Sequence, residues 1–518
     1  MKNWLNLLLI DLAALLFGAM LSFAFAPYAV FPFAVVAPAG LLALWLNASP
    51  KRAFWLGFVF GLGLFGTGVY WVFHSIHVFG GVPSFPAGLI TSGLIGVLAL
   101  FPALVGYFCN RYFPFTNAKK LIFAFPAIWV FSEWLRSFIF SGFPWLLIGY
   151  SQTSSPLKGY APVLGVYGVS LIVLMTSGLI VNGILQLRQK AYASVYLSLF
   201  AITCLWAAGG LLSFIPWTKP TGNPIPVSLV QGDIPQAVKW SPDHLRLSFD
   251  RYEKLTEPLW GKNKLIIWPE AAIPLSLQDA AGFIETMDEK ARTSGSSLIL
   301  GIPIQAADNA GYFNAVVTLG HEKQVYLKRR LVPFGEYVPF LELFPHLFNF
   351  MNIPLGNTIA GKVKQAPFVI DKVKILVSIC YEIAFPELIN TQDKMIGLLL
   401  TVSNDAWFGE SSAQAQHLQM AEMRALELKR PVLFVSNNGI TAIINPDGAI
   451  EASAPPRAVY VLNGTVQPTT GLTPWMYNGM DPLLVLLLGF IVAAVRENKR
   501  AAKQAETRTP IQSSSLKD

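Results

Sequence analysis

Three side chains with catalytic potential, Glu270, Lys328 and Cys380, each follow a short apolar run of strand length within two residues. Loops at strand ends are the usual location of sites in α/β folds. A thiol, a carboxylate and an ammonium group brought together there could carry out nucleophilic catalysis. The alternative, from the residues alone, is a capped strand end, a solvated lysine and a buried, inert cysteine.

Cys380 differs from the other two cysteines in its surroundings. Cys109 and Cys204 lie in long apolar runs, and the chain has no CxxC pair. Cys380 is therefore the single thiol of the more polar segment 219–475, which favours a chemical role. The histidines form no HExxH and no Cys/His ligand pattern, so we expect no metal.

The segments around these side chains indicate a layered α/β domain. Short apolar runs typical of buried strands occur at 227–230, 265–268, 298–300, 315–319, 324–327, 375–379, 398–402, 432–436 and 441–444. Helix-length segments lie between some of them, at about 243–260, 279–293 and 412–429. Strands that alternate with helices predict α/β layers around one core.

Charge divides the chain into two halves. Residues 219–475 carry 24 acidic and 22 basic side chains, whereas the rest of the 518 residues carries 6 acidic and 16 basic ones. The chain as a whole is 53% hydrophobic and 13% charged, about half the charge of a soluble protein. This composition excludes a disordered chain and a purely soluble enzyme. The slightly acidic soluble half also argues against a nucleic-acid partner.

Eight segments are long and apolar enough to predict membrane helices. They lie at about 4–25, 28–47, 53–73, 86–108, 121–138, 161–187, 191–213 and 480–495. With a cytoplasmic N-terminus, fourteen Lys and Arg residues fall on the cytoplasmic side and two on the other. By the positive-inside rule, both termini are cytoplasmic and the soluble block lies across the membrane.

The expected domains follow from these spans. We predict a transmembrane domain of seven helices at 1–216, a catalytic domain at 217–475, an eighth transmembrane helix at 476–498 and a cytoplasmic tail at 499–518. The polar composition of the tail predicts disorder.

The motifs around the reactive side chains resemble those of a known family. Trp-Pro-Glu at 268–270, Lys328 with the following Leu-Val-Pro-Phe-Gly-Glu at 331–336, and Cys-Tyr-Glu at 380–382 resemble the Glu-Lys-Cys triad of the nitrilase superfamily. Together with the spans, the chain is similar to the bacterial apolipoprotein N-acyltransferases. Further matches lie at 142–145 (Gly-Phe-Pro-Trp), 231–236, 403–409 and 470–474.

The resemblance implies a fold and a reaction. The fold would be a multi-pass α-helical membrane domain of eight helices with a nitrilase-like αββα sandwich. The reaction would move an acyl chain from a phospholipid, with phosphatidylethanolamine expected, to the N-terminal amine of a diacylglyceryl-cysteine apolipoprotein. No cofactor is needed, because an ester supplies the acyl group. The enzyme would lie in the inner membrane, with its catalytic domain in the periplasm, and a monomer suffices.

The resemblance also implies roles for individual residues. Cys380 would be the nucleophile, Glu270 the base, and Lys328 the stabiliser of the oxyanion, helped by the backbone N–H of Tyr381. Glu336 would orient Lys328, and Glu382 would support the site, although a plain surface acid is the alternative for Glu382.

Aromatic side chains are the candidates for contact with the lipid. The segment 331–355 is rich in aromatic and aliphatic residues, and we predict that it forms a lid in the membrane interface, with a loop packed on the domain as the alternative. The candidates for substrate binding are Trp145, Trp240, Phe334, Tyr337 and Trp407.

Two other functions remain open. A membrane-tethered amidase of the nitrilase type would use the same triad, but a soluble substrate needs neither a lid nor a membrane base. A transporter or sensor would predict intramembrane polar pairs and internal repeats. The sequence offers only Asp11 and the pair Glu133 and Arg136, and no evident repeat.

Overall fold

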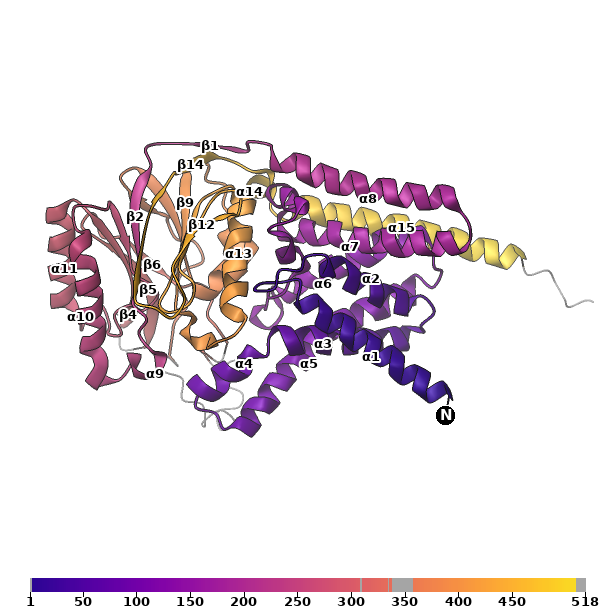
Figure 1. The fold of residues 1–518 in the computed structure, drawn as a ribbon, viewed down its shortest axis with the longest axis horizontal. Coiled ribbons are helices and arrows are strands. Elements are labelled where there is room, and N and C mark those ends of the chain that lie inside the picture. The colour runs from indigo at the N-terminus through magenta and orange to yellow at the C-terminus, as the bar shows by residue number, and fades with distance from the viewer. Residues whose placement is uncertain (1, 308–309, 334, 338–356, 509–518) are drawn as a thin grey trace, which may run out of the picture.

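The structure, a computed structural model, describes residues 2–307, 310–333, 335–337 and 357–508. It consists of an apolar bundle of helices and a sandwich of two β-sheets, which lie side by side (Figure 1). The sandwich follows the bundle in the chain, and a last helix returns from the sandwich along the bundle.

Each sheet of the sandwich has six strands. The first has the order β13-β2-β3-β4-β5-β6 and the second the order β12-β11-β10-β9-β8-β7, while β1 and β14 pair separately. The strands are β1 Thr218–Pro220, β2 Ile225–Gln231, β3 Leu265–Ile267, β4 Ser297–Gln305, β5 Tyr312–Leu319, β6 Val325–Leu327, β7 Phe368–Ile370, β8 Val373–Ile379, β9 Ile396–Ser403, β10 Val432–Ser436, β11 Ala442–Ile444, β12 Ile450–Ser453, β13 Tyr460–Val466 and β14 Thr469–Gly471. The expected strands are all present.

Parallel strands lie at the centre of both sheets. β2, β3 and β4 run parallel in the first sheet, and β8, β9 and β10 run parallel in the second. Alternate side chains of a strand face opposite sides of its sheet. In β3, Leu265 and Ile267 pack between the two sheets, whereas Ile266 packs against the outer helices. This double burial explains why these strands are continuous apolar runs rather than alternating ones.

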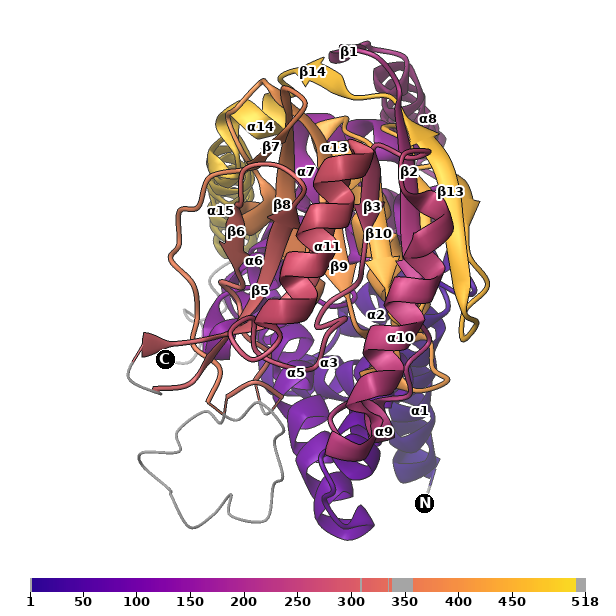
Figure 2. The ribbon, with the colours of Figure 1, turned by 90° about the vertical axis from the view of Figure 1, so that its left-hand side faces the viewer.

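Helices cover both outer faces of the sandwich. α10 (Leu245–Thr256) and α11 (Ala281–Ser294) cover the first sheet, and they lie in front of it in Figure 2. α13 (Ala413–Leu428) covers the second sheet and also packs on the membrane helices. The order of layers is therefore αββα, as expected, with α13 shared between the two halves (Figure 1).

The remaining helices form the bundle and the connections. They are α1 Lys2–Ser22, α2 Phe33–Trp45, α3 Pro50–Gly68, α4 Trp71–His74, α5 Ser84–Tyr112, α6 Phe125–Arg136, α7 Ala161–Arg188, α8 Tyr192–Ser213, α9 Gln236–Lys239, α12 Pro386–Ile389, α14 Pro474–Asn478 and α15 Asp481–Arg508. A helical segment lies in each of the eight ranges that hydropathy predicts.

Fewer than eight of these helices are long and apolar enough to cross a membrane by themselves. Among the described residues, four meet that standard: Trp4–Ser22, Ser84–Tyr112, Pro156–Arg188 and Tyr192–Ser213. Pro50–Gly68 and Trp71–Phe79 make a fifth if they form one span with a 54° bend. α2 has only 13 residues. The structure therefore supports four or five spans, and the count of eight stays a prediction.

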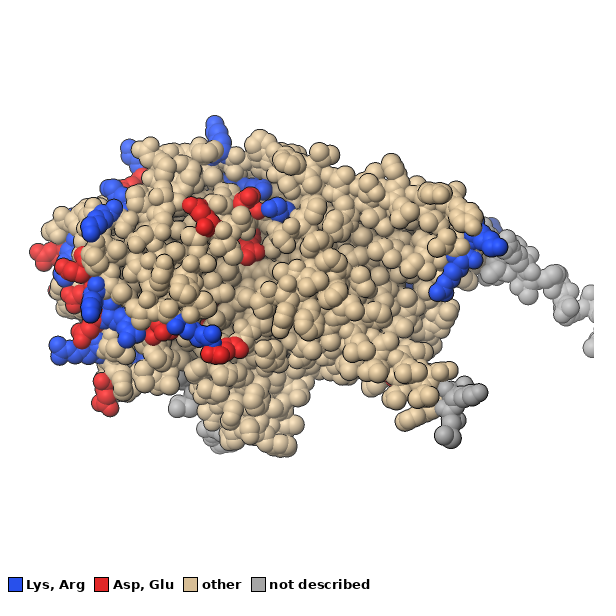
Figure 3. All heavy atoms as spheres, in the orientation of Figure 1, with Lys and Arg blue, Asp and Glu red and all other residues tan. Residues whose placement is uncertain are grey.

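The distribution of charge on the surface agrees with a membrane base. In the view of Figure 3, charged side chains gather on the sandwich and at the far end of the helices, and the surface between them is almost free of charge. Lipid tails tolerate such a band, because it holds almost no exposed charge to desolvate.

The end of the chain corrects one expectation. α15 continues to Arg508, so residues 499–508 are helical, where the sequence predicted a disordered tail. This segment is rich in Ala, Lys, Glu and Gln, which favour a helix even when they are polar. Residues 509–518 lie outside the described part of the chain.

Candidate active site

The three reactive side chains come from the ends of strands in both sheets. Glu270 follows β3 and Lys328 follows β6 in the first sheet, while Cys380 follows β8 in the second. The two sheets stack with these ends together, and Glu270 and Lys328 lie close enough to Cys380 for both to act on the pKa of its thiol. The predicted triad is therefore assembled at one edge of the sandwich.

A buried ion cluster forms one side of the site. The Lys328 ammonium lies 3.2 Å from Oε1 of Glu270 and 2.9 Å from Oε1 of Glu336. Asn314 of β5 donates to the same two oxygens, at 2.7 Å and 2.9 Å. Lys328 is 1% exposed, so the alternative of a solvated lysine is wrong. Glu336 contacts Lys328 as the resemblance implies.

The backbone fixes the Glu270 carboxylate from the other side. Its Oε2 accepts the backbone N–H of Asn404, which follows β9, at 2.9 Å. Gly301 of β4 packs against the turn that carries Glu270, and a Cβ there would lie 2.7 Å from Cα of Glu270. A glycine is needed at that close approach. Lys239 donates to the backbone carbonyl of Glu270 at 3.2 Å, and burial lowers the pKa of Lys239 to about 8.

The cluster sets the charge of the lysine. Burial alone would lower the pKa of Lys328, but the carboxylates of Glu270 and Glu336 outweigh it and raise that pKa well above its ordinary value. Lys328 is therefore a fixed positive charge at neutral pH, suited to stabilise an oxyanion rather than to exchange a proton.

The Cys380 side chain, in contrast, is held in its neutral form. Burial and the negative charge of Glu270 raise the pKa of Cys380 well above its ordinary value, and Lys328 only partly offsets them. The resting group is a thiol and not a thiolate. As a nucleophile it would need a base, and Glu270 is the carboxylate that raises the pKa of this thiol most.

The backbone turns sharply at Cys380. Its φ is +50°, in the left-handed region that residues with a Cβ rarely adopt. Such local strain persists only where the surroundings hold it in place. Here a short helix, Cys380–Ala384, begins directly after β8.

Glu382 holds this turn. Its carboxylate accepts the backbone N–H of Ile379 at 2.8 Å and that of Arg329, next to Lys328, at 2.7 Å. The Tyr326 hydroxyl donates to it at 2.8 Å. Glu382 is completely buried, so the alternative of a surface acid is wrong. Glu382 therefore connects the turn at Cys380 with the backbone next to Lys328.

A loop of the membrane half supports the same turn. The Tyr381 hydroxyl donates to the carbonyl of Gly142 at 2.8 Å. Arg136 of α6 donates to the carbonyls of Phe143 and Trp145 at 3.2 Å and 2.6 Å. The motif 142–145 is therefore a structural contact between the two halves.

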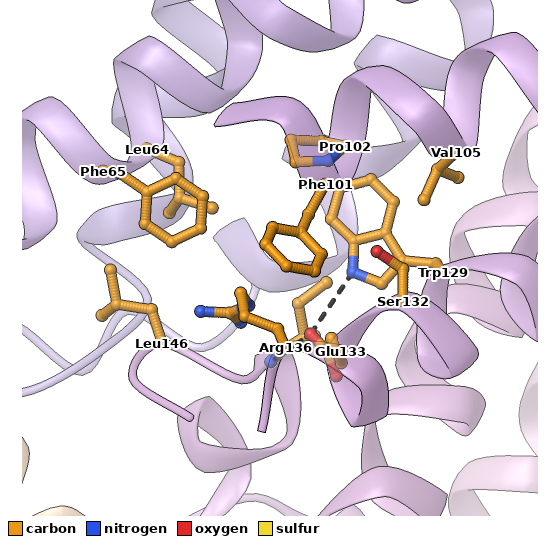
Figure 4. Close-up of a pocket in the computed structure, with 11 residues that line it drawn as sticks. Leu64, Phe65, Phe101, Pro102, Val105, Trp129, Ser132, Glu133, Arg136 and Leu146 are labelled. Carbon is orange, nitrogen blue, oxygen red and sulfur yellow. Dashed lines mark hydrogen bonds between the residues drawn. The ribbon is translucent and has the colours of Figure 1, made fainter. Parts of the chain in front are cut away.

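A narrow cavity lies beside Arg136 in the membrane half (Figure 4). Glu133 lines it too and accepts from the Trp129 ring at 3.3 Å and from the backbone N–H of Ile148 at 2.9 Å. Arg136 and Glu133 thus both serve to hold the loop after α6. That role explains this polar pair without a transport function.

The aromatic candidates for substrate contact differ in their surroundings. Trp145 is 1% exposed and packs in the core, with its ring N–H donating to Gln416 at 2.6 Å, which favours a packing role. Trp240 and Trp407 are partly exposed. The Tyr337 hydroxyl contacts that of Ser141. Phe334 and most of the predicted lid lie outside the described residues.

Asn314 and Asn404 contact the Glu270 carboxylate, and sequence reasoning assigned them no role. Asn404 lies in the motif 403–409 at a strand end, and this position could have identified it as a site residue. Asn314 is inside β5, and its neighbours along the strand give no sign of its partner. Among the described residues, no group of three or more His, Cys, Asp or Glu side chains could hold a metal ion.

Comparison with known proteins supports both halves of this architecture. Residues 17–179 match the family model of the apolipoprotein N-acyltransferase N-terminal domain, and residues 227–474 match that of the carbon-nitrogen hydrolases. The second match covers the sandwich and all three reactive side chains.

Relatives with both halves are similar along nearly their whole length. Apolipoprotein N-acyltransferases of Coxiella burnetii and Methylococcus capsulatus are 42% and 39% identical to the chain, over 92% and 96% of it and 98% of each relative. That of Vibrio cholerae is 38% identical over 91% of the chain and 94% of the relative. With such identity and coverage, the chain belongs to the apolipoprotein N-acyltransferase family.

Proposed function

We propose that the chain transfers an acyl group from a phospholipid to the N-terminal amine of a diacylglyceryl-cysteine lipoprotein, through a thioester on Cys380. The observation that carries this proposal is the buried cluster of Lys328, Glu270 and Glu336 beside a single thiol. A lysine kept charged by two carboxylates suits a reaction in which negative charge develops on a carbonyl oxygen.

In the first half of the reaction, Glu270 accepts the thiol proton as the sulfur of Cys380 attacks the ester carbonyl. The carbonyl π electrons move to oxygen, and Lys328 and the backbone N–H of Tyr381 stabilise this oxyanion. When the oxyanion collapses, the C–O bond breaks. Glu270 returns the proton to the departing lysophospholipid, and the acyl group remains as a thioester.

In the second half, the lipoprotein amine attacks the thioester. Glu270 takes a proton from the amine, the C–S bond breaks, and the proton returns to the sulfur of Cys380. In both halves Glu270 is neutralised while the oxyanion forms, so the net charge of the buried site does not change. This matters because an uncompensated charge is costly to bury.

A lipid substrate requires a route from the membrane to the site, and exposed apolar residues supply a candidate. Phe138, Ile139 and Phe140, just after α6, are all exposed, and Phe140 is 71% exposed. They precede Gly142, whose carbonyl accepts from Tyr381. Such a patch favours contact with lipid. We place it in the outer interface of the inner membrane, with the sandwich in the periplasm, eight spans, and a monomer as the working unit.

Intact mass spectrometry tests the proposal. The purified protein is incubated in detergent with phosphatidylethanolamine, and Cys380→Ala is compared with wild type and with Cys204→Ala. We expect wild type and Cys204→Ala to gain the mass of one acyl chain, which hydroxylamine removes, and Cys380→Ala to gain none. No mass gain in wild type, with the lipid intact, would reject the thioester.

A further inference from the structure

A buried histidine contacts the backbone of Cys380. His417, on α13, is completely buried. Its Nε2 lies 3.1 Å from the backbone carbonyl oxygen of Cys380, and its Nδ1 lies 3.0 Å from Oδ1 of Asp405. The motif around Asp405 drew attention in the sequence, but His417 did not, and neither residue takes part in the reaction described above.

The contact with Cys380 fixes one proton of the ring. A carbonyl oxygen only accepts, so Nε2 of His417 must carry a proton and donate it to Cys380. On the other side of the ring, Oδ1 of Asp405 accepts from the Ser403 hydroxyl at 2.7 Å and lies against Nδ1 of His417. Asp405 is itself held in place and in turn holds the imidazole.

The orientation of the ring is fixed by aromatic neighbours. The Trp145 ring stacks on the imidazole with centroids 5.8 Å apart, and Phe408 and Phe434 meet it edge-on at 6.0 Å and 5.2 Å. Trp145 is itself held by Arg136, so the membrane half also contributes to the position of His417.

A hydrogen bond to the Cys380 carbonyl has a consequence for the next residue. In a trans peptide, the C=O and the following N–H point in opposite directions, and the Cys380–Tyr381 peptide is trans. When the carbonyl of Cys380 points to His417, the N–H of Tyr381 points away from His417. The hydrogen bond also polarises the peptide, which makes that N–H a better donor.

We propose that His417, held by Asp405, is a positioning residue that orients and polarises the Cys380–Tyr381 peptide, so that the Tyr381 N–H serves as an oxyanion donor. This inference rests on the proposed function, because that function supplies the oxyanion. It predicts that His417 matters for acyl transfer and much less for the intrinsic reactivity of the thiol.

Two reactions of the same cysteine separate these effects. Thioester formation from phosphatidylethanolamine passes through an oxyanion, whereas alkylation by iodoacetamide displaces iodide from a saturated carbon and forms none. Both rates are measured by intact mass spectrometry under single-turnover conditions. For His417→Met we expect thioester formation to fall by ~10–100-fold, with alkylation changed by less than about threefold on the same argument.

A matched control lies on the same helix. Gln419 is buried, and its side chain accepts the backbone N–H of Ala26 at 3.1 Å, away from Cys380. Gln419→Met loses a buried polar contact of the same helix, but we expect both rates to stay near those of wild type. Equal loss of both rates in His417→Met, or no loss of thioester formation, would overturn the inference.

A second pair of variants covers the case in which His417→Met does not fold. The amide nitrogen of Gln can replace Nε2 of the histidine, whereas that of Asn reaches only the position of Nδ1. We expect His417→Gln to keep most of the thioester rate and His417→Asn to lose it, and equal rates would contradict the proposal. Failure of wild type to form a thioester would instead reject the proposed function itself.

Discussion

The two halves of the molecule each bury a basic and an acidic side chain, but with different partners. In the sandwich, Lys328 contacts the carboxylates of Glu270 and Glu336 directly. In the membrane half, Arg136 donates to backbone carbonyls and Glu133 accepts a backbone N–H. These partners do not titrate, and the contacts of the membrane pair serve to hold a loop. A partner that titrates allows the sandwich cluster to respond to a proton, and this is what the proposed reaction uses.

Loss of the ammonium group is expected to have the largest effect. Lys328→Met removes the charge that faces the oxyanion, and we expect thioester formation to fall by ~10²–10³-fold. The measurement is the single-turnover rate of acylation. Lys290→Met is the control, because Lys290 forms its ion pairs with Glu253 and Glu257 at the surface. A loss of similar size in the control would show that the assay reports general damage.

Glu270→Gln is expected to have the next largest effect on acyl transfer. It should affect the pKa of the thiol and the rate of acyl transfer in different ways. The charge of Glu270 raises the pKa of Cys380, so its removal should shift the midpoint of alkylation against pH to a lower value. Acyl transfer should nevertheless fall strongly, because the base is lost.

Glu336→Gln is the matched control for that shift, since Glu336 also contacts Lys328 but is not among the groups that perturb the thiol most. An upward shift of the midpoint in Glu270→Gln would contradict the geometry of the site.

The membrane pair should behave as a brace. Arg136→Met leaves the carbonyls of Phe143 and Trp145 without their donor, at a cost of about 1–3 kcal/mol each. We expect a lower unfolding temperature, and a loss of acylation per folded molecule that is much smaller than for Lys328→Met. If acylation falls as far as in Lys328→Met with unchanged thermal stability, the contrast between the two clusters is wrong.

The smallest effect is expected for Tyr381→Phe. This change removes the hydroxyl that donates to Gly142 but keeps the backbone N–H of residue 381. We expect a stability loss of about 1 kcal/mol, measured by thermal unfolding, and a smaller loss of acylation than in any variant above. A loss as large as that of Lys328→Met would mean that the side chain, rather than the backbone, acts in the reaction.

Much of this architecture follows from simple patterns. Buried parallel strands are apolar throughout, so the sequence predicts β3 and β8 and, at their ends, Glu270 and Cys380. The partners of these residues do not follow in the same way. Asn314 and His417 approach the site from a neighbouring strand and from a helix, and their contacts depend on how the layers stack.

Other expectations depend on a pattern that has two physical meanings. An aromatic residue near a membrane interface can line an entrance or fill a core, and the burial of Trp145 favours the core. Polar residues after a membrane span can form a disordered tail or extend the helix, and α15 extends to Arg508. Composition alone does not distinguish these outcomes. An aromatic ring is stable in a core and at a membrane interface, and a polar segment is stable in water as a helix or as a disordered tail.

The most direct test of the account follows the acyl group from the enzyme to its acceptor. Protein carrying a labelled acyl chain on Cys380 is freed of phospholipid and mixed with a diacylglyceryl-cysteine peptide that has a free N-terminal amine. We predict that the label leaves the enzyme only as fast as it appears in an amide on the peptide. Release of the label as free fatty acid, at the same rate with and without the peptide, would contradict the account and indicate a hydrolase.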